Sequence, residues 1–418
     1  MKESYNIVVV AYAVYPEIKS SEGIVNANWI AVLEAGEISV QLFSVHTSAK
    51  ELRNYKNHGL VKNYTAAKSK SFLPNFIFKI KNKLHSNTYG VSYHLDVWRK
   101  KQLPLFNAIV EKDNAVVWAR LLPLEGLMLP LESSKTFDFP LVINVNDPVV
   151  EDGSYPFFSE LISKTQCWTF PSFALASLTA GQYELDIARC FVLPHAMKKQ
   201  QVLYSKAAKI TEMLSVLYTG TFYKSAFTEE LQRGLIAFCK SKAAASVSFT
   251  FILAQYDSQS IQWLEETIPN VKILKNLERE AVLKISSEAD LMLVVDAATH
   301  TPLLKGKLAE AISLGMPVLG ISYKESVMDQ VLNAYGCYCA YQDEKGDVLS
   351  KLTQAIESLN NPIWQAGFEA SRMEVMTQFS EEEIRSRTQK ITEFAAKRYQ
   401  AQKNNLVVPE APLINPWP

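Results

Sequence analysis

The stretch ADLMLVVDAATHTPLLKGKLAEAISLGMPVLG occupies residues 289–320 and decides the fold expected for the second half of the chain. Asp290 stands near its start and precedes the apolar run LMLVV, which is typical of a strand buried on both faces of a sheet. A loop follows, then a helical pattern that ends at Gly315, and then PVLGI at 317–321 as the next strand. A strand, a helix and a strand in this order predict a βαβ unit and therefore a parallel sheet.

The same alternation extends outward to both ends of the chain. The first half begins with IVVVA at 7–11, a helix from Gly23 to Gly36, and a strand at 40–45. Further strands are expected in the first half at 115–119, 140–145, 167–172 and 190–194, and in the second half at 216–220, 249–254 and 271–274. The last long helical pattern covers roughly 381–402.

Two consecutive sets of this kind predict an α/β protein with two doubly wound, Rossmann-like domains that face each other across a cleft. The expected parts are an N-terminal domain at 1–197, a polar, Lys-rich linker at 198–211, a C-terminal domain at 212–378, a helix at 379–402 and a tail at 403–418. The tail is rich in proline, so we expect an extended strap or disorder there.

Composition places the chain among ordinary folded proteins. Hydrophobic residues make up 48% and charged residues 21%, and 43 basic residues balance 43 acidic ones. This balance argues against a nucleic-acid partner on net charge alone. The five cysteines are odd in number and show no CxxC spacing, which favours free thiols in a reducing cytosol. Since we find neither a signal peptide nor an apolar run of about 18 residues, we expect a cytoplasmic chain without a membrane anchor.

Several common catalytic motifs are missing from the sequence. It contains no GxGxxG, Walker A, GxSxG, HExxH or DxD pattern. A dinucleotide fingerprint, a P-loop, a hydrolase elbow and a zinc-protease site are therefore unsupported.

The start of the helix in 289–320 is instead suited to a phosphate. A helix N-terminus offers unpaired N–H groups and the positive end of a dipole to an anion. Lys305 and Lys307 add positive charge at this end. Glu310 lies one turn after Lys307, where it is placed to accept hydrogen bonds from ribose hydroxyls.

The segment KLAEAISLGMPVLG resembles the nucleotide-sugar site of retaining glycosyltransferases of the GT-B fold, family-4-like (glycosyl transferases group 1). VLYTGTF at 216–222 is similar to the first strand and phosphate loop of the same domain in that family. The resemblance covers roughly residues 5–395 by element order. It implies the GT-B fold with the C-terminal helix returning to the N-terminal domain, and transfer of a sugar from a nucleotide-diphosphate sugar to a saccharide or lipid-linked acceptor.

The resemblance also implies roles for particular residues, with no metal and no cofactor apart from the donor. Catalytic roles fall on Lys224, Asp147 and Glu310. Donor binding falls on Gly220, Thr221, Lys305, Lys307, Leu308 and Glu310. Acceptor binding falls on Gly23, Arg120, Asn146 and His195. In the mechanism implied, the leaving phosphate takes the acceptor proton, so no separate protein base is needed.

This sequence departs from the family pattern at some of these positions. Pro302 stands where many relatives have a second glutamate, and Asn146 stands where the family often has histidine.

Several site residues also have structural interpretations. Glu310 and Lys307 are alternatively solvated helix residues, Lys224 a surface loop residue, and His195 a structural histidine. Asp147 precedes a proline and is also explained as part of a turn. Arg120 is alternatively paired with an internal acid.

Residues 52–95 form a second informative stretch. They carry eight lysines and arginines and no acid, so the remaining chain has 35 basic and 43 acidic residues, a net charge of −8. The centre, SKSFLPNFIFKIKNKLH, mixes lysine with Phe, Ile and Leu, a composition typical of a segment that settles on anionic lipid. The alternative is a basic surface loop and helix.

The leading hypothesis is a cytoplasmic sugar transferase in polysaccharide or glycolipid assembly, with peripheral attachment at the inner face of a membrane as a further expectation. Two alternatives remain open on the same fold, because fold alone does not determine function. One is a nucleotide-sugar epimerase, which needs an acid and base pair that we cannot assign. The other is a degenerate nucleotide-sugar-binding partner protein without activity.

Overall fold

The computed structural model describes residues 5–14, 21–46, 64–66, 80, 83–84, 93–112, 114–121, 127–148, 158–196, 213–221, 226–256 and 258–418. The chain divides into two compact units, which we treat separately. One comprises Met1–Lys198 with Glu381–Trp417, and the other comprises Lys199–Ser380. The expected linker at 198–211 lies outside the described residues.

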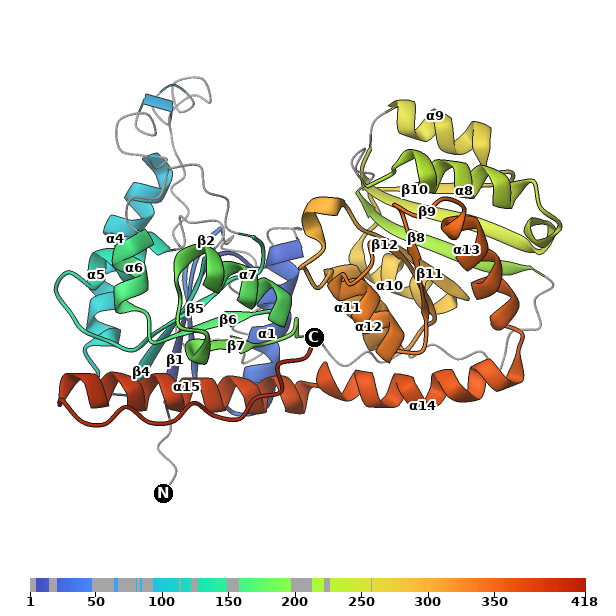
Figure 1. The fold of residues 1–418 in the computed structure, drawn as a ribbon. Coiled ribbons are helices and arrows are strands. Elements are labelled where there is room, and N and C mark those ends of the chain that lie inside the picture. The colour runs from blue at the N-terminus through green and yellow to red at the C-terminus, as the bar shows by residue number, and fades with distance from the viewer. Residues whose placement is uncertain are drawn as a thin grey trace. The chain divides into compact units, whose positions relative to one another are not determined.

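The N-terminal unit is built on a seven-stranded parallel sheet (Figure 1). Its strands are β1 (Asn6–Ala13), β2 (Val40–His46), β3 (Tyr64–Ala66), β4 (Ala115–Arg120), β5 (Leu141–Asn144), β6 (Cys167–Phe170) and β7 (Cys190–Val192). They lie side by side in the order β3-β2-β1-β4-β5-β6-β7. The connecting helices are α1 (Ser21–Ala35), α4 (Tyr93–Val110), α5 (Met128–Ser133), α6 (Phe158–Lys164) and α7 (Phe173–Tyr183). The sheet order reverses between β1 and β4, which defines a doubly wound unit.

The C-terminal unit repeats this plan with a six-stranded parallel sheet in the order β10-β9-β8-β11-β12-β13. Its strands are β8 (Leu214–Thr221), β9 (Val247–Gln255), β10 (Lys272–Lys275), β11 (Leu291–Val295), β12 (Val318–Ser322) and β13 (Tyr338–Tyr341). Its helices are α8 (Glu229–Cys239), α9 (Ser258–Thr267), α10 (Arg279–Glu288), α11 (Gly306–Leu314), α12 (Val327–Ala334), α13 (Asp347–Ser358) and α14 (Pro362–Gln378). The expected α/β fold with two doubly wound units is confirmed.

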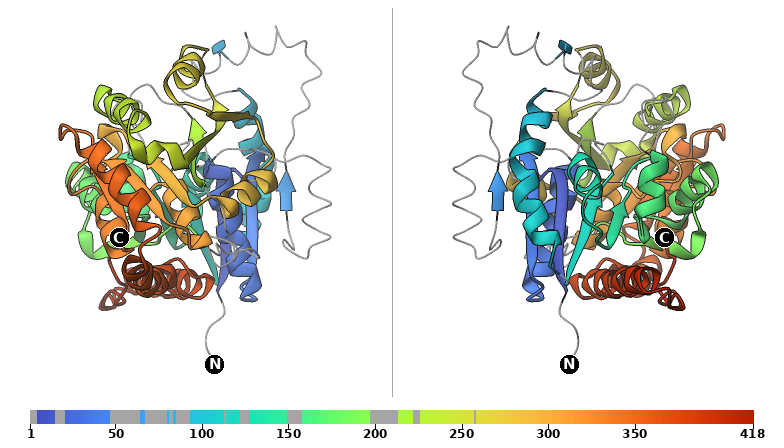
Figure 2. Two further views of the ribbon diagram at one scale, coloured as in Figure 1. Left: turned by 90° about the vertical axis from the view of Figure 1, so that its right-hand side faces the viewer. Right: turned by 90° about the vertical axis from the view of Figure 1, so that its left-hand side faces the viewer.

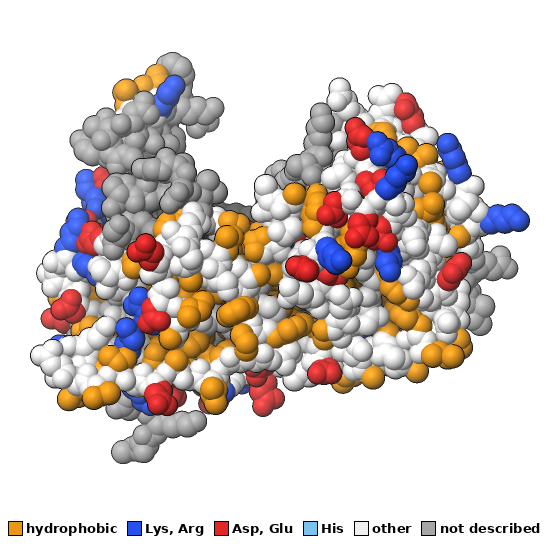
Figure 3. All heavy atoms as spheres, viewed as in Figure 1, with side chains coloured by type: hydrophobic (Ala, Val, Ile, Leu, Met, Phe, Trp, Pro, Cys, Tyr) orange, Lys and Arg blue, Asp and Glu red, His pale blue; other side chains and the backbone are white. Residues whose placement is uncertain are grey.

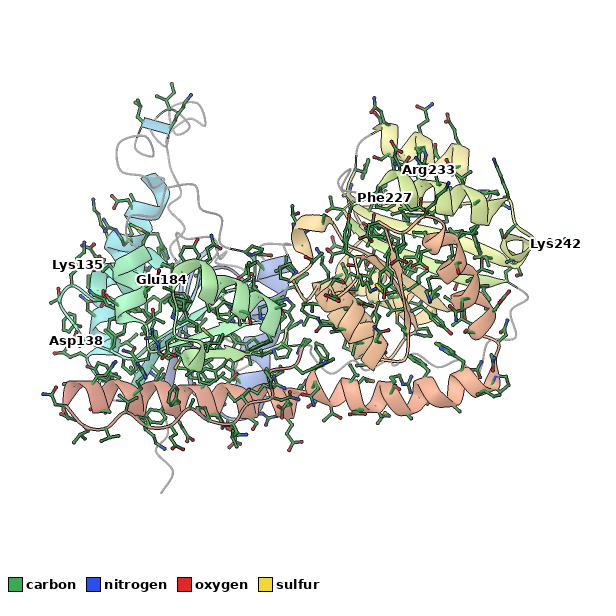
Figure 4. All side chains as sticks on the ribbon, viewed as in Figure 1. Lys135, Asp138, Glu184, Phe227, Arg233 and Lys242 are labelled. Carbon is green, nitrogen blue, oxygen red and sulfur yellow. The ribbon has the colours of Figure 1, made fainter. Side chains whose placement is uncertain are left out.

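The two faces of the C-terminal sheet are covered by different helices. Apolar side chains of α8, α9 and α13 share one core cluster with alternate residues of the strands. On the opposite face α12 comes very close to β12, because a side chain at Gly320 would lie 2.3 Å from Leu332 Cδ1. The outward face of α8 is charged, and Arg233 pairs there with Glu229 at 2.5 Å (Figures 3 and 4). This helix is therefore amphipathic, as its position on the sheet requires.

The last helix, α15 (Glu381–Lys403), completes the core of the N-terminal unit (Figures 1 and 2). Ile384, Ile391 and Phe394 are buried in the same cluster as β1 and α1. Two indole N–H groups bind the helix: Trp29 donates to Thr388 at 3.1 Å and Trp118 to Thr392 at 3.2 Å. The first half of the chain therefore depends on its last helix for part of its core.

The tail after α15 is extended and is held by a buried arginine. Arg387, 1% exposed, donates through Nη1 to the carbonyls of Val192 at 3.1 Å and Asn415 at 3.0 Å. Ile414 packs against the core of the N-terminal unit. Of the two interpretations offered by the proline-rich composition, the structure shows the strap.

One difference from the sequence-based elements concerns the site. The first helix begins at Ser21, two residues earlier than expected, so Gly23 lies inside its first turn. Glu22 in that turn favours the earlier start, because an acid near a helix N-terminus interacts favourably with the dipole.

All five cysteines are free thiols. Among the described residues, no helix combines the length and apolar character needed to cross a bilayer.

Candidate functional site

The C-terminal sheet reverses its strand order between β8 and β11, and its candidate site lies at the carboxyl ends of these strands. Such switch points leave a crevice where ligands bind in doubly wound sheets. β8 ends at Thr221, and β11 ends at Val295, just before a loop that leads into α11 (Figure 1). The sequence-predicted donor residues Gly220, Thr221, Lys305 and Lys307 therefore belong to the two elements that flank this point.

Gly220 has a backbone conformation that other residues rarely adopt. Its φ is +142°, and the pairing register of β8 with β9 shifts between Gly220 and Thr221. The hydroxyl of Tyr218 donates to the Thr221 carbonyl at 2.7 Å, across this irregularity in the strand. β8 ends at Thr221. Lys224, the expected catalytic cation, follows this end in the sequence and lies outside the described residues.

At the N-terminus of α11, the first backbone N–H groups have no hydrogen-bond acceptor among the described residues. The first intrahelical bond runs from Ala309 N–H to the Lys305 carbonyl at 3.1 Å, so the N–H groups of Gly306, Lys307 and Leu308 precede it. Lys305 is the N-cap and provides no side-chain cap. Leu308 is fully buried, whereas Gly306 and Lys307 are partly exposed. Accessible N–H groups at the positive end of a helix dipole are suited to an anion.

Lys305 is tied to an internal acid that the sequence analysis missed. Its Nζ lies 2.8 Å from Oδ1 of Asp296, whose side chain is fully buried. Asp296 also accepts a hydrogen bond from the Ser322 hydroxyl at 3.2 Å. The sequence did carry a signal, because Asp296 is a polar residue directly after an apolar strand. A buried pair of this kind fixes the lysine stem beside the start of α11.

Glu310 is buried and lies between two cations. Its Oε2 accepts a hydrogen bond from Arg279 Nη1 at 3.1 Å, and its Oε1 lies 3.6 Å from Lys307 Nζ. Oε1 has no hydrogen-bond partner among the described residues. The interpretation of Glu310 as a solvated helix residue is therefore wrong, since it is only 3% exposed. Arg279 is 31 residues away in sequence, and no local pattern pointed to it.

A second polar cluster lies at the carboxyl edge of the N-terminal sheet. Arg120 ends β4, is 4% exposed, and donates to the side-chain oxygens of Asn144 and of Asn146, the latter at 3.1 Å. Its guanidinium also covers the Trp29 ring at 5.1 Å from the centroid. Burial lowers the pKa of Arg120 to about 10, and the charge of Glu22 opposes that shift.

Glu22 is the main residue of this cluster that the sequence analysis did not identify. Its Oε2 accepts from Asn146 Nδ2 at 2.9 Å and its Oε1 from Asn26 Nδ2 at 3.0 Å. Burial raises the pKa of Glu22, while Arg120, Asn146 and Asn26 act in the opposite direction. A glutamate in the first turn of a helix is normally explained by a favourable interaction with the helix dipole. The sequence therefore gave no reason to expect a contact between Glu22 and Asn146.

The other acceptor-side predictions are placed less centrally. Gly23 follows Glu22 in α1 and is buried. Asp147 is exposed beside Asn146. His195 is 7% exposed and lies three residues beyond the end of β7, at the same edge of the sheet. The structure thus brings Arg120 and Asn146 together directly.

Comparison with known proteins shows which fold these units form. No protein-family model and no curated protein matches the chain. Solved structures match it over nearly its whole length. A glycosyltransferase from Rickettsia africae shares 12% identity and a TM-score of 0.64, over 94% of this chain and 99% of that chain. TarM from S. aureus shares 10% identity and a TM-score of 0.65, over 93% and 99%.

An α,α-trehalose-phosphate synthase (UDP-forming) from Burkholderia vietnamiensis is similar to the same extent. It shares 11% identity and a TM-score of 0.60, over 93% of this chain and 99% of that chain. Likenesses at such low identity show the fold. The chain therefore has the GT-B glycosyltransferase fold, as the resemblance implied.

Proposed function

We propose that this chain is a glycosyltransferase that moves a sugar from a nucleotide-diphosphate sugar to a saccharide or lipid-linked acceptor. The observation that carries the proposal is the free N-terminus of α11 at the switch point of the C-terminal sheet, with the Glu310 carboxylate in the next turn. A diphosphate suits the N–H groups at the start of this helix, and a ribose suits the carboxylate. The named neighbours support this reading, because one was solved with UDP and another is a UDP-forming synthase.

The unsatisfied oxygen of Glu310 is consistent with the ribose role. A buried acceptor without a donor costs free energy, and a ribose hydroxyl would supply the missing hydrogen bond. Lys307, whose side chain is 39% exposed, lies 3.6 Å from this oxygen. Its flexible stem can move aside when a ligand enters, and its charge then lies near the diphosphate.

The chemistry we propose is retaining and needs no metal. The bond between the sugar C1 and the phosphate oxygen breaks, and its electron pair goes to the leaving diphosphate. The helix N–H groups, Lys305 and Lys307, and Lys224 from the segment outside the described residues, would stabilise that charge. The acceptor oxygen bonds to C1, and its proton passes to the leaving phosphate. Asn146 and Asp147 would orient the acceptor or the transferred sugar.

A second candidate is a nucleotide-sugar-binding protein without transfer activity. It is favoured by the internal pairing of the cations, since Lys305 is bound to Asp296 and Arg279 to Glu310. Release of UDP, GDP or ADP from the corresponding nucleotide sugar in the presence of saccharide acceptors separates the two candidates. Binding without release would favour the second.

Nucleotide binding itself is tested by a thermal-shift and calorimetry panel of UDP, GDP, ADP and their glucose conjugates. Glu310→Gln should weaken binding of the preferred nucleotide about 10-fold or more, because a hydrogen bond to a charged group contributes about 1.5–3 kcal/mol. Glu265→Gln on the exposed face of α9 is the matched control. Absence of any shift would refute the transferase proposal, and equal affinity in Glu310→Gln would refute the role of Glu310.

We also propose that the basic stretch at 52–95 contacts an anionic membrane surface. Most of this stretch lies outside the described residues; within it, Ile80, Lys83 and Leu84 are exposed. Flotation with anionic vesicles at low salt, but not with neutral ones, is the expected result. Equal flotation with both would contradict it.

A further inference from the structure

The orientation of the Asn146 amide is determined by its neighbours. An amide oxygen and nitrogen are hard to tell apart from shape alone, but a guanidinium can only donate. Because Arg120 Nη1 lies 3.1 Å from one end of the amide, that end is the oxygen. The NH₂ group therefore faces Glu22, and it lies 2.9 Å from Oε2. Asn146 thus bridges the buried guanidinium of Arg120 and the carboxylate of Glu22.

Glu22 and Asn146 keep hydrogen-bonding capacity beyond these contacts. The carboxylate has about four acceptor sites, and side chains of the described residues occupy two of them, Asn26 and Asn146. The Asn146 NH₂ has a second hydrogen with no other partner among the described residues. Both side chains are only partly buried. A donor and free acceptor sites lie next to each other, which is what two neighbouring hydroxyl groups require.

The positive and negative charges of the cluster differ in their exposure. Arg120 is 4% exposed, its Nη1 donates inward to Asn144 and Asn146, and the Trp29 ring covers it. The carboxylates of Glu22 and of exposed Asp147 are the more accessible charges. A phosphate or carboxylate brought to this edge would meet these two acids, and like charges at short distance are strongly disfavoured.

The cluster is also held rigidly by neighbouring strands. Asn144 donates through Nδ2 to the Thr169 hydroxyl at 2.9 Å, which ties β5 to β6 behind Arg120. Asn26, fully buried in α1, holds the other oxygen of Glu22. Such a preorganised group binds a ligand without a further loss of side-chain freedom.

We propose that Glu22 and Asn146 form a hydroxyl-binding pair at the carboxyl edge of the N-terminal sheet, selective for neighbouring hydroxyls of an uncharged saccharide over a phosphorylated one. The role of that saccharide as acceptor rests on the proposed function, but its binding does not. Glu22 determines specificity in this proposal, because it supplies both the acceptor oxygens and the negative charge.

The test is direct binding of saccharides to the full chain, followed by ligand-observed NMR. The probes are the methyl α-glycosides of glucose, galactose, mannose and N-acetylglucosamine, each compared with its 6-phosphate. At least one neutral glycoside should bind about 10-fold more tightly than its phosphate. Glu22→Gln should weaken that glycoside about 10-fold and should reduce the preference over the phosphate. Glu37→Gln, exposed just beyond the other end of α1, should change neither quantity.

A second variant keeps the proposal falsifiable if Glu22→Gln disturbs the fold. Asn146→Asp retains the shape but replaces the donor with an acceptor, so it should also weaken glycoside binding about 10-fold or more. The proposal is overturned if no glycoside binds the wild-type chain, if the phosphates bind more tightly, or if both variants bind as the wild type does. The nucleotide panel is measured on the same variants and should not change. Glycoside binding without nucleotide binding would therefore refute the proposed function and still support the hydroxyl-binding pair.

Discussion

Arg387 offers the sharpest stability prediction, because one buried guanidinium joins three parts of the N-terminal unit. Its Nε pairs with Glu383 at 2.7 Å, and its Nη1 donates to Val192 at the end of β7 and to Asn415 in the tail. Arg387→Met keeps most of the buried stem but removes these charge-assisted hydrogen bonds. The Val192 carbonyl stays buried without its donor, whereas the tail can return to water.

The magnitude follows from these two different outcomes. A hydrogen bond to a charged donor contributes about 1.5–3 kcal/mol, and an orphaned buried carbonyl keeps the full penalty. We therefore expect the free energy of unfolding of the N-terminal unit to fall by about 3–4 kcal/mol. In a chain that ends at Lys403, the contribution of the tail is already absent, so the same substitution should cost about 1.5 kcal/mol less.

Chemical denaturation followed by tryptophan fluorescence measures both quantities, since Trp29 and Trp118 are hydrogen-bonded to α15. Lys390→Met on the exposed side of the same helix is the control and should change stability by less than about 0.5 kcal/mol. A loss below about 1 kcal/mol in Arg387→Met would contradict the reasoning. So would an equal loss in the full chain and in the shortened one.

Three further predictions concern single positions. Gly220→Ala should destabilise the C-terminal unit by about 1–2 kcal/mol because φ is +142°, whereas Gly367→Ala, a helical position with open space, should stabilise it slightly in the same melting experiment. Asp290→Ala should lower the free energy of unfolding by about 2–4 kcal/mol, since one buried carboxylate oxygen accepts from Ser215 N–H at 2.8 Å and from Ser215 Oγ at 3.0 Å. Nucleotide affinity should stay unchanged, because Asp290 lies at the edge of the sheet opposite to the candidate site. A loss of nucleotide affinity in this variant would count against the site. Burial raises the pKa of Glu34 to about 8 from 4.5, because the folded protein disfavours the charged carboxylate. The contribution of Glu34 to the free energy of unfolding is therefore most favourable below about pH 4.5, and it falls as pH rises toward 8. Glu34→Gln should therefore raise stability near pH 9 by about 1–2 kcal/mol, after allowance for solvent screening, and change little near pH 5; the reverse order in denaturation curves would contradict this.

Much of the secondary structure was readable from local patterns. The apolar runs at 7–11 and 115–119 are strands β1 and β4, because a strand buried on both faces must be apolar throughout, and the run at 249–254 is β9. Gly315 ends α11 in the left-handed conformation, with φ of +70°, as its position after the helical pattern indicated. These features depend on interactions within a few residues, so one sequence suffices to predict them.

The stretch between β12 and α15 was largely missed. α13 has an amphipathic pattern, with Val348, Leu352 and Ala355 buried, and could have been predicted from it. β13 has four residues and only partial burial at its ends, which resembles a loop in sequence. Edge strands of this length carry too little periodicity to be recognised before the sheet is known.

The sequence by itself determined the α/β class, the repeated strand and helix alternation, and the helix start that carries Lys305, Lys307 and Glu310. Only the tertiary structure decided which partners these residues have. Arg279 reaches Glu310 across 31 residues, and Glu22 reaches Asn146 across 124. The physical reason is that strand order, rather than chain order, brings the carboxyl ends of parallel strands together. Once the order is set, burial and hydrogen bonding select which polar side chains pair, and no local pattern contains that information.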